Sequence, residues 1–182
     1  RFKDEGLIPD TSGTYNVLED FVINLANTGW LQYHYYDFKA KHFVYKAHVS
    51  WKTAAETNEV SGCGIVFGVN PGRNENDDYY GVVLDKSRIF FSYTQAGYYF
   101  DLGKTRGTGK LNFSNPAEAD STLLVYDYKA YVYVNEEFIG EYTLKPDQEL
   151  NGKFGYGVIS GTNRDYGTRC EITNSRMWKL SK

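Results

Sequence analysis

Hydrophobic and polar side chains alternate with a period of two residues along most of this sequence. The clearest example is HFVYKAHVSW, residues 42–51, in which every second side chain is hydrophobic: Phe43, Tyr45, Ala47, Val49 and Trp51. A period of two is typical of a β-strand with one buried face. Similar runs occur at 15–24, 29–36, 63–69, 79–84, 88–93, 122–128, 130–135, 137–143, 154–160, 168–174 and 175–180.

Turn-forming residues separate these runs, for example Pro71-Gly72, Asn135-Glu136 and Asn151-Gly152. No segment shows an apolar stripe with the period of an α-helix, and we expect at most one helical turn, over 115–121. Many short strands with frequent turns predict an all-β fold, and their number fits a two-sheet antiparallel β-sandwich better than one open sheet. Without a Pro- or Ser-rich linker to divide the chain, we predict a single domain over 1–182.

Composition adds one unusual feature, which is the abundance of aromatic residues: 17 Tyr, 11 Phe and 3 Trp in 182 residues. Tyrosine suits half-buried strands and also recognition surfaces, because it combines a rigid ring with a hydroxyl. The formal net charge of -3 gives no excess of positive charge that would favour nucleic-acid binding. No apolar run reaches the roughly 18 residues of a membrane-spanning helix. The chain begins at Arg1, so we expect a mature form or a part of a longer chain.

The two cysteines, Cys63 and Cys170, lack the CxxC spacing of zinc and redox sites. Each alternates with an isoleucine, Ile65 or Ile172, which turns both sulfur atoms inward. This pattern is compatible with one disulfide and equally with two buried thiols.

Three stretches resemble a known superfamily. They are FVYKAHVSW followed by SGCGIVFGV and DDYYGVVLDKSRIFFSY; STLLVYDYKAYVYVNEEFIGEYTL; and GKFGYGVISGTNRDYGTRCEITNSRMWKL, together covering most of 43–180. They resemble the concanavalin A-like and laminin G-like jelly rolls, in particular family 66 carbohydrate-binding modules and the domain of 3-keto-disaccharide hydrolases. The resemblance implies a jelly roll, a lectin-like role in glycan binding, and attachment to enzymes at bacterial surfaces. One departure is Asn135-Glu136 in place of the usual Asn-Gly, which requires a non-glycine residue at positive φ or a longer turn.

The glucanases of this superfamily use paired carboxylates in an ExDxE or ExDxxE arrangement, and we find no complete copy. The stretch EADSTL at 118–123 lacks the last acid, and Glu137 and Glu141 would stand roughly 13 Å apart along a strand. A retaining mechanism needs about 5–5.5 Å. Neither GxSxG, HExxH nor a phosphate-binding GxxxxGK[ST] occurs. We therefore predict no catalytic residues and no enzymatic activity.

Sugar-binding sites combine aromatic rings, which pack on the C–H faces of sugars, with fixed polar groups that pair with hydroxyls. Three stretches offer this mixture: NPGRNENDDYY, YTQAGYYFD and GTNRDYGTR. The candidate ligand-binding residues are Arg73, Asn76, Asp78, Tyr80, Tyr98, Tyr99, Asn163, Arg164 and Tyr166. One residue of each adjacent tyrosine pair is expected to face the core.

Calcium is a minority option. Asn74, Asn76 and Asp78 imitate the start of an EF-hand loop, but Tyr79 replaces the glycine that the loop requires. A looser site at Asp77 or Asp78 stays open, and we predict no metal site and no cofactor.

The function predicted from the sequence is a non-catalytic carbohydrate-binding module, an accessory domain of a larger extracellular or cell-surface protein. Its partner would be a polysaccharide or oligosaccharide, with no nucleic acid and no membrane span. The alternative is a protein-interaction or adhesion domain of the laminin G-like type, and a spacer domain without any ligand is the third option.

Overall fold

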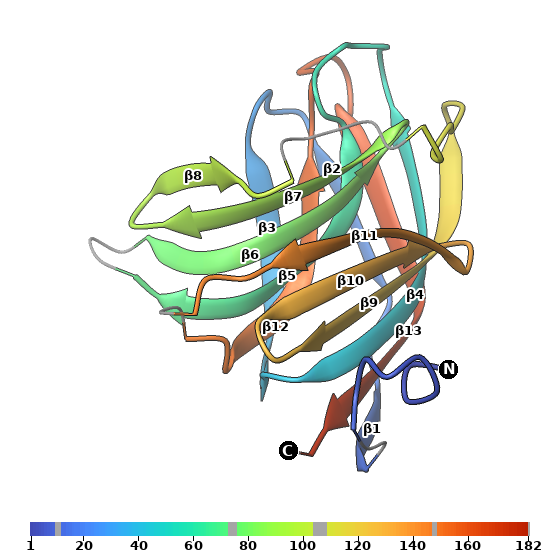
Figure 1. The fold of residues 1–182 in the computed structure, drawn as a ribbon. Coiled ribbons are helices and arrows are strands. Elements are labelled where there is room, and N and C mark those ends of the chain that lie inside the picture. The colour runs from blue at the N-terminus through green and yellow to red at the C-terminus, as the bar shows by residue number, and fades with distance from the viewer. Residues whose placement is uncertain (10–11, 73–75, 104–108, 147–148, 182) are drawn as a thin grey trace.

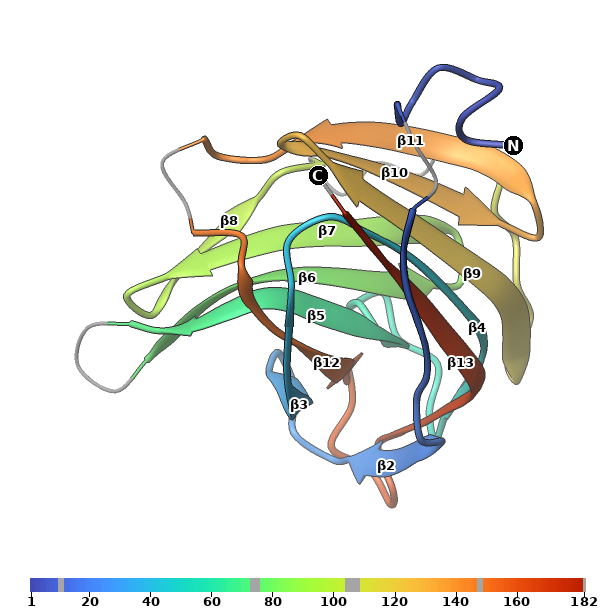
Figure 2. The same cartoon turned by 90° about the horizontal axis from the view of Figure 1, so that it is seen from below.

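The computed structural model describes residues 1–9, 12–72, 76–103, 109–146 and 149–181. Its strands form two antiparallel sheets packed face to face (Figures 1 and 2), so the predicted β-sandwich is confirmed. The described residues contain no helix, and none of them therefore forms an apolar helix able to cross a membrane.

The seven-stranded sheet has the order β1-β13-β4-β9-β10-β11, with β2 also pairing to β13. Its strands are β1 (Gly13–Val17), β2 (Phe21–Leu25), β4 (Phe43–Thr53), β9 (Ala117–Tyr126), β10 (Lys129–Val134), β11 (Glu137–Thr143) and β13 (Thr168–Leu180). The six-stranded sheet has the order β3-β12-β5-β6-β7-β8. Its strands are β3 (Leu31–Ala40), β5 (Gly62–Pro71), β6 (Asp77–Asp85), β7 (Arg88–Gln95), β8 (Tyr98–Asp101) and β12 (Gly152–Ile159).

Apart from small shifts at strand ends, the strands differ from the sequence prediction in four places. The run 15–24 divides into β1 and β2, whereas 168–174 and 175–180 join into β13 through a register shift against β4. Residues 117–121, where we expected at most one helical turn, belong to β9, and residues 98–101 form β8, which the pattern did not predict. The β-propensity of the local sequence is weak at such places, and hydrogen bonds to a neighbouring strand determine whether the residues form a strand.

The core lies between the sheets and is rich in aromatic rings. The predicted inward face of β4 is buried, and Phe43 and Tyr45 pack against Phe154 from the opposite sheet, with ring centroids 5.8 and 4.9 Å apart. The Tyr45 hydroxyl lies 3.3 Å from Ser175 Oγ, which satisfies a polar group that burial would otherwise leave unpaired. Part of the tyrosine content is thus explained by the core.

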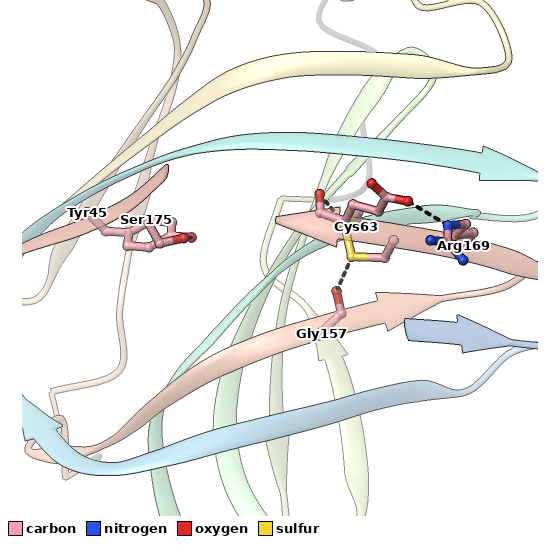
Figure 3. Close-up of a disulfide and its surroundings, with 7 residues drawn as sticks. Tyr45, Cys63, Gly157, Arg169 and Ser175 are labelled. Atoms are coloured by element: carbon pink, nitrogen blue, oxygen red, sulfur yellow. Dashed lines mark hydrogen bonds and ion pairs between the residues drawn. A yellow bond between two sulfur atoms is a disulfide. The ribbon is translucent and has the colours of Figure 1, made fainter. Parts of the chain in front are cut away.

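A disulfide joins Cys63 of β5 to Cys170 of β13 and so connects the two sheets (Figure 3). The Cα atoms are 5.3 Å apart, and Cys170 Sγ lies 3.9 Å from the carbonyl oxygen of Gly157. Of the two states that the sequence left open, the structure has the bonded one.

Two hairpins of the seven-stranded sheet turn on residues in the left-handed region. Asn135 and Glu136 have φ values of 49° and 68°, and Asp127 and Tyr128 have 50° and 62°. Two consecutive positive φ values are the mark of the type I′ turn, whose twist matches that of the flanking strands. Of the two alternatives that the sequence left open after Val134, the structure has non-glycine residues at positive φ rather than a longer turn.

Candidate functional site

A cleft of about 530 Å³ lies on the outer face of the six-stranded sheet. Because successive side chains of a strand point to opposite faces, β6 sends Tyr80 into the core and Tyr79 outward. The cleft is lined by Gly29, Trp30, Leu31, Tyr33, Asn76, Asp77, Tyr79, Phe90, Ser92, Thr94, Gly97, Tyr99 and Ile159. Most of these residues come from β3, β6, β7, β8 and the end of β12, so the sheet order assembles the site. Gly29, Trp30, Asn76 and Gly97 lie in the connections next to these strands.

Glycines beneath the cleft let Leu31 lie close to the sheet. A Cβ atom on Gly157 would stand 3.0 Å from Leu31 Cδ1, and one on Gly81 would stand 3.2 Å from Leu31 Cδ2 and 2.9 Å from Ser92 Oγ. Larger residues at these two positions would push the Leu31 side chain away from the sheet and into the cleft. The depth of the cleft therefore depends on glycine at positions 81 and 157 as well as on the aromatic walls.

Two aromatic pairs form the walls. Tyr33 packs on Tyr79 with ring centroids 4.7 Å apart, and Tyr99 stacks parallel to Phe90 at 5.4 Å. Trp30 is 66% exposed and Tyr99 is 49% exposed, so both keep ring surface open to solvent. The Tyr99 ring, held by Phe90, provides rigid apolar surface for a ligand.

The polar groups of the cleft are held in defined positions. The Tyr33 hydroxyl donates to Asp77 Oδ2 at 2.8 Å. Burial, followed by this hydrogen bond, raises the pKa of the Tyr33 hydroxyl well above its ordinary value, so the group stays protonated and continues to donate. Asp77 retains its second carboxylate oxygen, and Asn76, Ser92 and Thr94 add amide and hydroxyl groups.

Charge is sparse in this cleft. Among the described residues that line it, Asp77 is the one acid, and no lysine, arginine or histidine is present. A ligand that carries carboxylate or sulfate groups would meet no compensating cation on these residues.

The structure brings two of the predicted site residues into the cleft, Asn76 and Tyr99. Asp78 lies beside it, where its Oδ1 accepts a hydrogen bond from the Ala96 amide at 2.8 Å. Asp78 thus supports the turn that precedes Tyr98 and Tyr99. Arg73 lies outside the described residues.

Tyr80 was a wrong prediction as a ligand contact. Its side chain is 0% exposed, it stacks on Phe67 with centroids 5.1 Å apart, and its hydroxyl accepts a hydrogen bond from the Lys145 amide at 2.9 Å. The sequence shows that one of Tyr79 and Tyr80 faces the core, but not which one, because both faces of β6 are buried.

Tyr98 is 73% exposed but belongs to the other face of β8. Tyr99 stacks on Phe90 on the cleft side, whereas its neighbour Phe100 pairs with Tyr93 of the core at 6.1 Å. By alternation Tyr98 shares the side of Phe100 and does not line the cleft.

Asn163, Arg164 and Tyr166 lie in the connection between β12 and β13 and do not line the cleft either. Arg164 takes part in the loop through its backbone, with its carbonyl accepting from the Gly167 amide at 2.7 Å. The Tyr166 ring lies 5.3 Å from Lys52 Nζ of β4 in the opposite sheet. Ligand contact by these three residues stays a prediction.

Sequence reasoning missed Trp30, Tyr33 and Phe90 as cleft residues. For Tyr33 a signal existed, because Leu31, Tyr33 and Tyr35 form an alternating hydrophobic face in LQYHYY. Nothing local separates Trp30 or Phe90 from core aromatics, and their role depends on the strand order.

The described residues hold no group of three or more His, Cys, Asp or Glu side chains suited to a metal ion. Asn74, part of the EF-hand-like pattern, lies outside them. The widely spaced acids Glu137 and Glu141 are each paired with a lysine, Lys110 at 3.2 Å and Lys129 respectively.

The chain was also compared with known proteins. No protein-family model and no curated protein sequence matches it. Among solved structures, it is similar to the carbohydrate-binding module CBM66 from Bacillus subtilis, with a TM-score of 0.58 at 9% identity over 89% of this chain and 94% of that one.

Two enzymes also share the fold. A fructosyltransferase from A. japonicus is similar with a TM-score of 0.59 at 10% identity, over 93% of this chain but only 27% of that one. A β-glucanase from Bacillus licheniformis reaches a TM-score of 0.50 at 12% identity, over 80% and 69% of the two chains. The neighbours thus include a binding module and enzymes, and at these identities the likeness establishes the fold alone, a two-sheet jelly roll.

Proposed function

We propose that this chain is a non-catalytic carbohydrate-binding module whose cleft on the six-stranded sheet holds an uncharged saccharide. The observation that carries the proposal is the combination of two exposed rings, Trp30 and Tyr99, with the fixed polar pair of Tyr33 and Asp77. The rings would cover the C–H face of a sugar, and the polar groups would pair with its hydroxyls.

A binding role is favoured over catalysis by the charges in the cleft. Glycoside hydrolysis uses two carboxyl groups on either side of the scissile bond. The described residues of the cleft supply only Asp77, which is engaged with Tyr33. This acid is therefore proposed to accept hydrogen bonds rather than to transfer a proton.

The setting is proposed to be extracellular, as an accessory part of a longer protein. The disulfide between Cys63 and Cys170 supports an oxidising compartment, where such bonds persist. The similar region of the fructosyltransferase is 27% of that chain, an example of this fold within a larger protein.

The test is a panel of purified polysaccharides examined by affinity electrophoresis, followed by calorimetry on the best binder. We expect binding to at least one neutral plant or bacterial polysaccharide, and weaker binding to uronate-rich or sulfated ones. Trp30→Ala should lower the affinity about 5- to 30-fold, as expected for a loss of about 1–2 kcal/mol of ring contact. Trp178→Ala is the matched control, since it removes an exposed tryptophan from the opposite sheet.

Failure of every polysaccharide to bind would refute the proposal. In that case the laminin G-like alternative would be preferred, and a partner protein would be sought on the same aromatic surface.

A further inference from the structure

A second hollow, of about 380 Å³, lies on the outer face of the seven-stranded sheet and is formed mainly by apolar side chains. Its lining is Arg1, Phe2, Lys3, Ile8, Tyr15, Val44, Lys46, Arg176, Trp178 and Leu180. It shares no residue with the saccharide cleft on the other sheet. We call it the apolar pocket.

The floor of the apolar pocket is one row of cross-strand neighbours. Trp178 of β13 stands directly opposite Tyr15 of β1 and Val44 of β4. The Tyr15 and Trp178 rings meet edge to face with centroids 5.8 Å apart, and Trp178 stays 43% exposed. The pocket therefore presents an indole face that no described side chain covers completely.

The N-terminal segment, residues 1–9, forms the wall. Ile8 is buried in a small cluster with Leu124, Tyr131, Tyr133 and Leu180 on the outer side of the sheet, and Phe2 packs against the same cluster. This satellite core anchors the segment, so the wall is a packed element of the fold.

Two cations stand in the next cross-strand row at the rim. Lys46 of β4 is the direct partner of Arg176 of β13, and both side chains are exposed. Like charges directly opposite one another on a sheet are unfavourable. Within the described part of the chain neither forms an ion pair, whereas Lys110, Lys129 and Lys153 each pair with a carboxylate.

The other charged residues around the rim of the apolar pocket include Lys3 and Arg1. Lys3 of the wall also makes no ion pair with a described residue, while Arg1 is engaged with Glu5 at 3.0 Å and lies over Tyr133. Asp120 and Glu136 border the neighbouring hollow beyond Lys46 and Arg176, and Asp120 Oδ1 is hydrogen-bonded to His48 Nδ1 at 2.9 Å. An apolar floor thus meets two cations, Lys46 and Arg176, that form no ion pair with a described residue.

We propose that the apolar pocket binds a small amphipathic anion, namely an aryl carboxylate or a close analogue. The aromatic body would lie on Trp178 between Tyr15 and the N-terminal wall, and the anionic group would lie between Lys46 and Arg176. The volume is at the lower end of about 300–1,000 Å³ for small-molecule sites, which suits a ligand of one or two rings. Relief of the Lys46–Arg176 repulsion would add to the binding.

The experiment compares two fluorescent probes of similar shape on the whole chain: 8-anilino-1-naphthalenesulfonate, an aryl anion, and N-phenyl-1-naphthylamine, which lacks the sulfonate. We expect one site for the anionic probe. Lys46→Gln and Arg176→Gln should each weaken its binding about 2- to 5-fold, the range of exposed charge contacts, and the double variant about 10-fold. Binding of the uncharged probe should change less than 2-fold, and added salt should weaken only the anionic probe.

Lys52→Gln is the matched control, because it removes one exposed positive charge from the same face of the same strand outside the pocket. It should leave both probes unchanged, as should Trp30→Ala. Equal responses of the two probes, or variants without effect, would reduce the pocket to a nonspecific apolar surface and overturn the proposal. A dimer that excludes the probe would overturn it as well, in favour of a second copy as the occupant.

Discussion

At the scale of single residues, the tyrosines show how one side chain takes different roles in this protein. Tyr45 and Tyr80 are core residues whose hydroxyls find partners inside the sandwich, Ser175 Oγ and the Lys145 amide. Tyr33 and Tyr99 instead stand on the outer face of the six-stranded sheet, held by Tyr79 and Phe90. Burial raises the pKa of the Tyr99 hydroxyl, with the nearby Asp101 as a second cause, so this group too remains a neutral donor.

The adjacent residues Tyr98 and Tyr99 allow a direct test of the saccharide cleft. Tyr99→Ala should weaken polysaccharide binding about 5- to 30-fold, because it removes a ring of the cleft wall worth about 1–2 kcal/mol. Tyr98→Ala should leave the affinity within 2-fold, because that side chain belongs to the opposite face of β8. Isothermal titration calorimetry measures the polysaccharide affinity of both variants. An equal loss of affinity in the two would mean that the ligand lies elsewhere on β8.

At the scale of elements, the hairpin of β7 and β8 positions the outermost ring of the cleft. Its turn places Ala96 at φ 50° and Gly97 at φ 81°, and Gln95 pairs with Tyr98 across it. The carboxylate of Asp78 on β6 accepts the Ala96 amide and ties the turn to the neighbouring strand. This tie adds to the pairing of β8, which is only four residues long, and to the stacking of Tyr99 on Phe90.

Asp78→Ala should therefore loosen the turn without unfolding the sandwich. We expect faster exchange of the Ala96 amide proton, a fall in the free energy of unfolding of about 1–2 kcal/mol, and weaker saccharide binding. Asp78→Asn keeps an oxygen acceptor and should retain most of the protection. Hydrogen exchange followed by NMR measures the effect, and an Ala96 amide that exchanges at the original rate in the alanine variant would show that the carboxylate does not hold the hairpin.

At the scale of the whole molecule, the disulfide connects the sheets across a sequence separation of 107 residues. Cys63 is on β5, in the sheet that carries the cleft, and Cys170 is on β13, which contributes Trp178 and Arg176 to the apolar pocket. Closing a loop of this length restricts the unfolded chain and stabilises the folded state by about 4–5 kcal/mol.

The double variant Cys63→Ala/Cys170→Ala should thus unfold at markedly lower urea concentration, with a loss of about 4–5 kcal/mol. Added reductant should lower the stability of the original chain and leave that of the double variant unchanged. Urea denaturation followed by tryptophan fluorescence measures both effects. A double variant as stable as the original chain would show that sheet packing alone sets the stability.

What the sequence determined by itself is the layered all-β architecture. Its period of two turns one face of β4 inward, and turn residues such as Asn135-Glu136 mark the hairpins, because these signals act between neighbours along the chain. The sequence also pointed to Asn76 and Tyr99, through the mixture of aromatic and polar residues in their loops.

Only the tertiary structure decided which side of a strand with two buried faces is the interior. It therefore separated Tyr79 from Tyr80, and it left Asn163, Arg164 and Tyr166 out of the lining of the cleft. The order β3-β12-β5-β6-β7-β8 brings Tyr99 to the same cleft as Trp30 and Tyr33, which lie far from it in the sequence, and the packing of the two sheets brings Cys63 to Cys170. The cleft and the disulfide depend on contacts between residues far apart in the sequence, which a local alternation pattern does not encode.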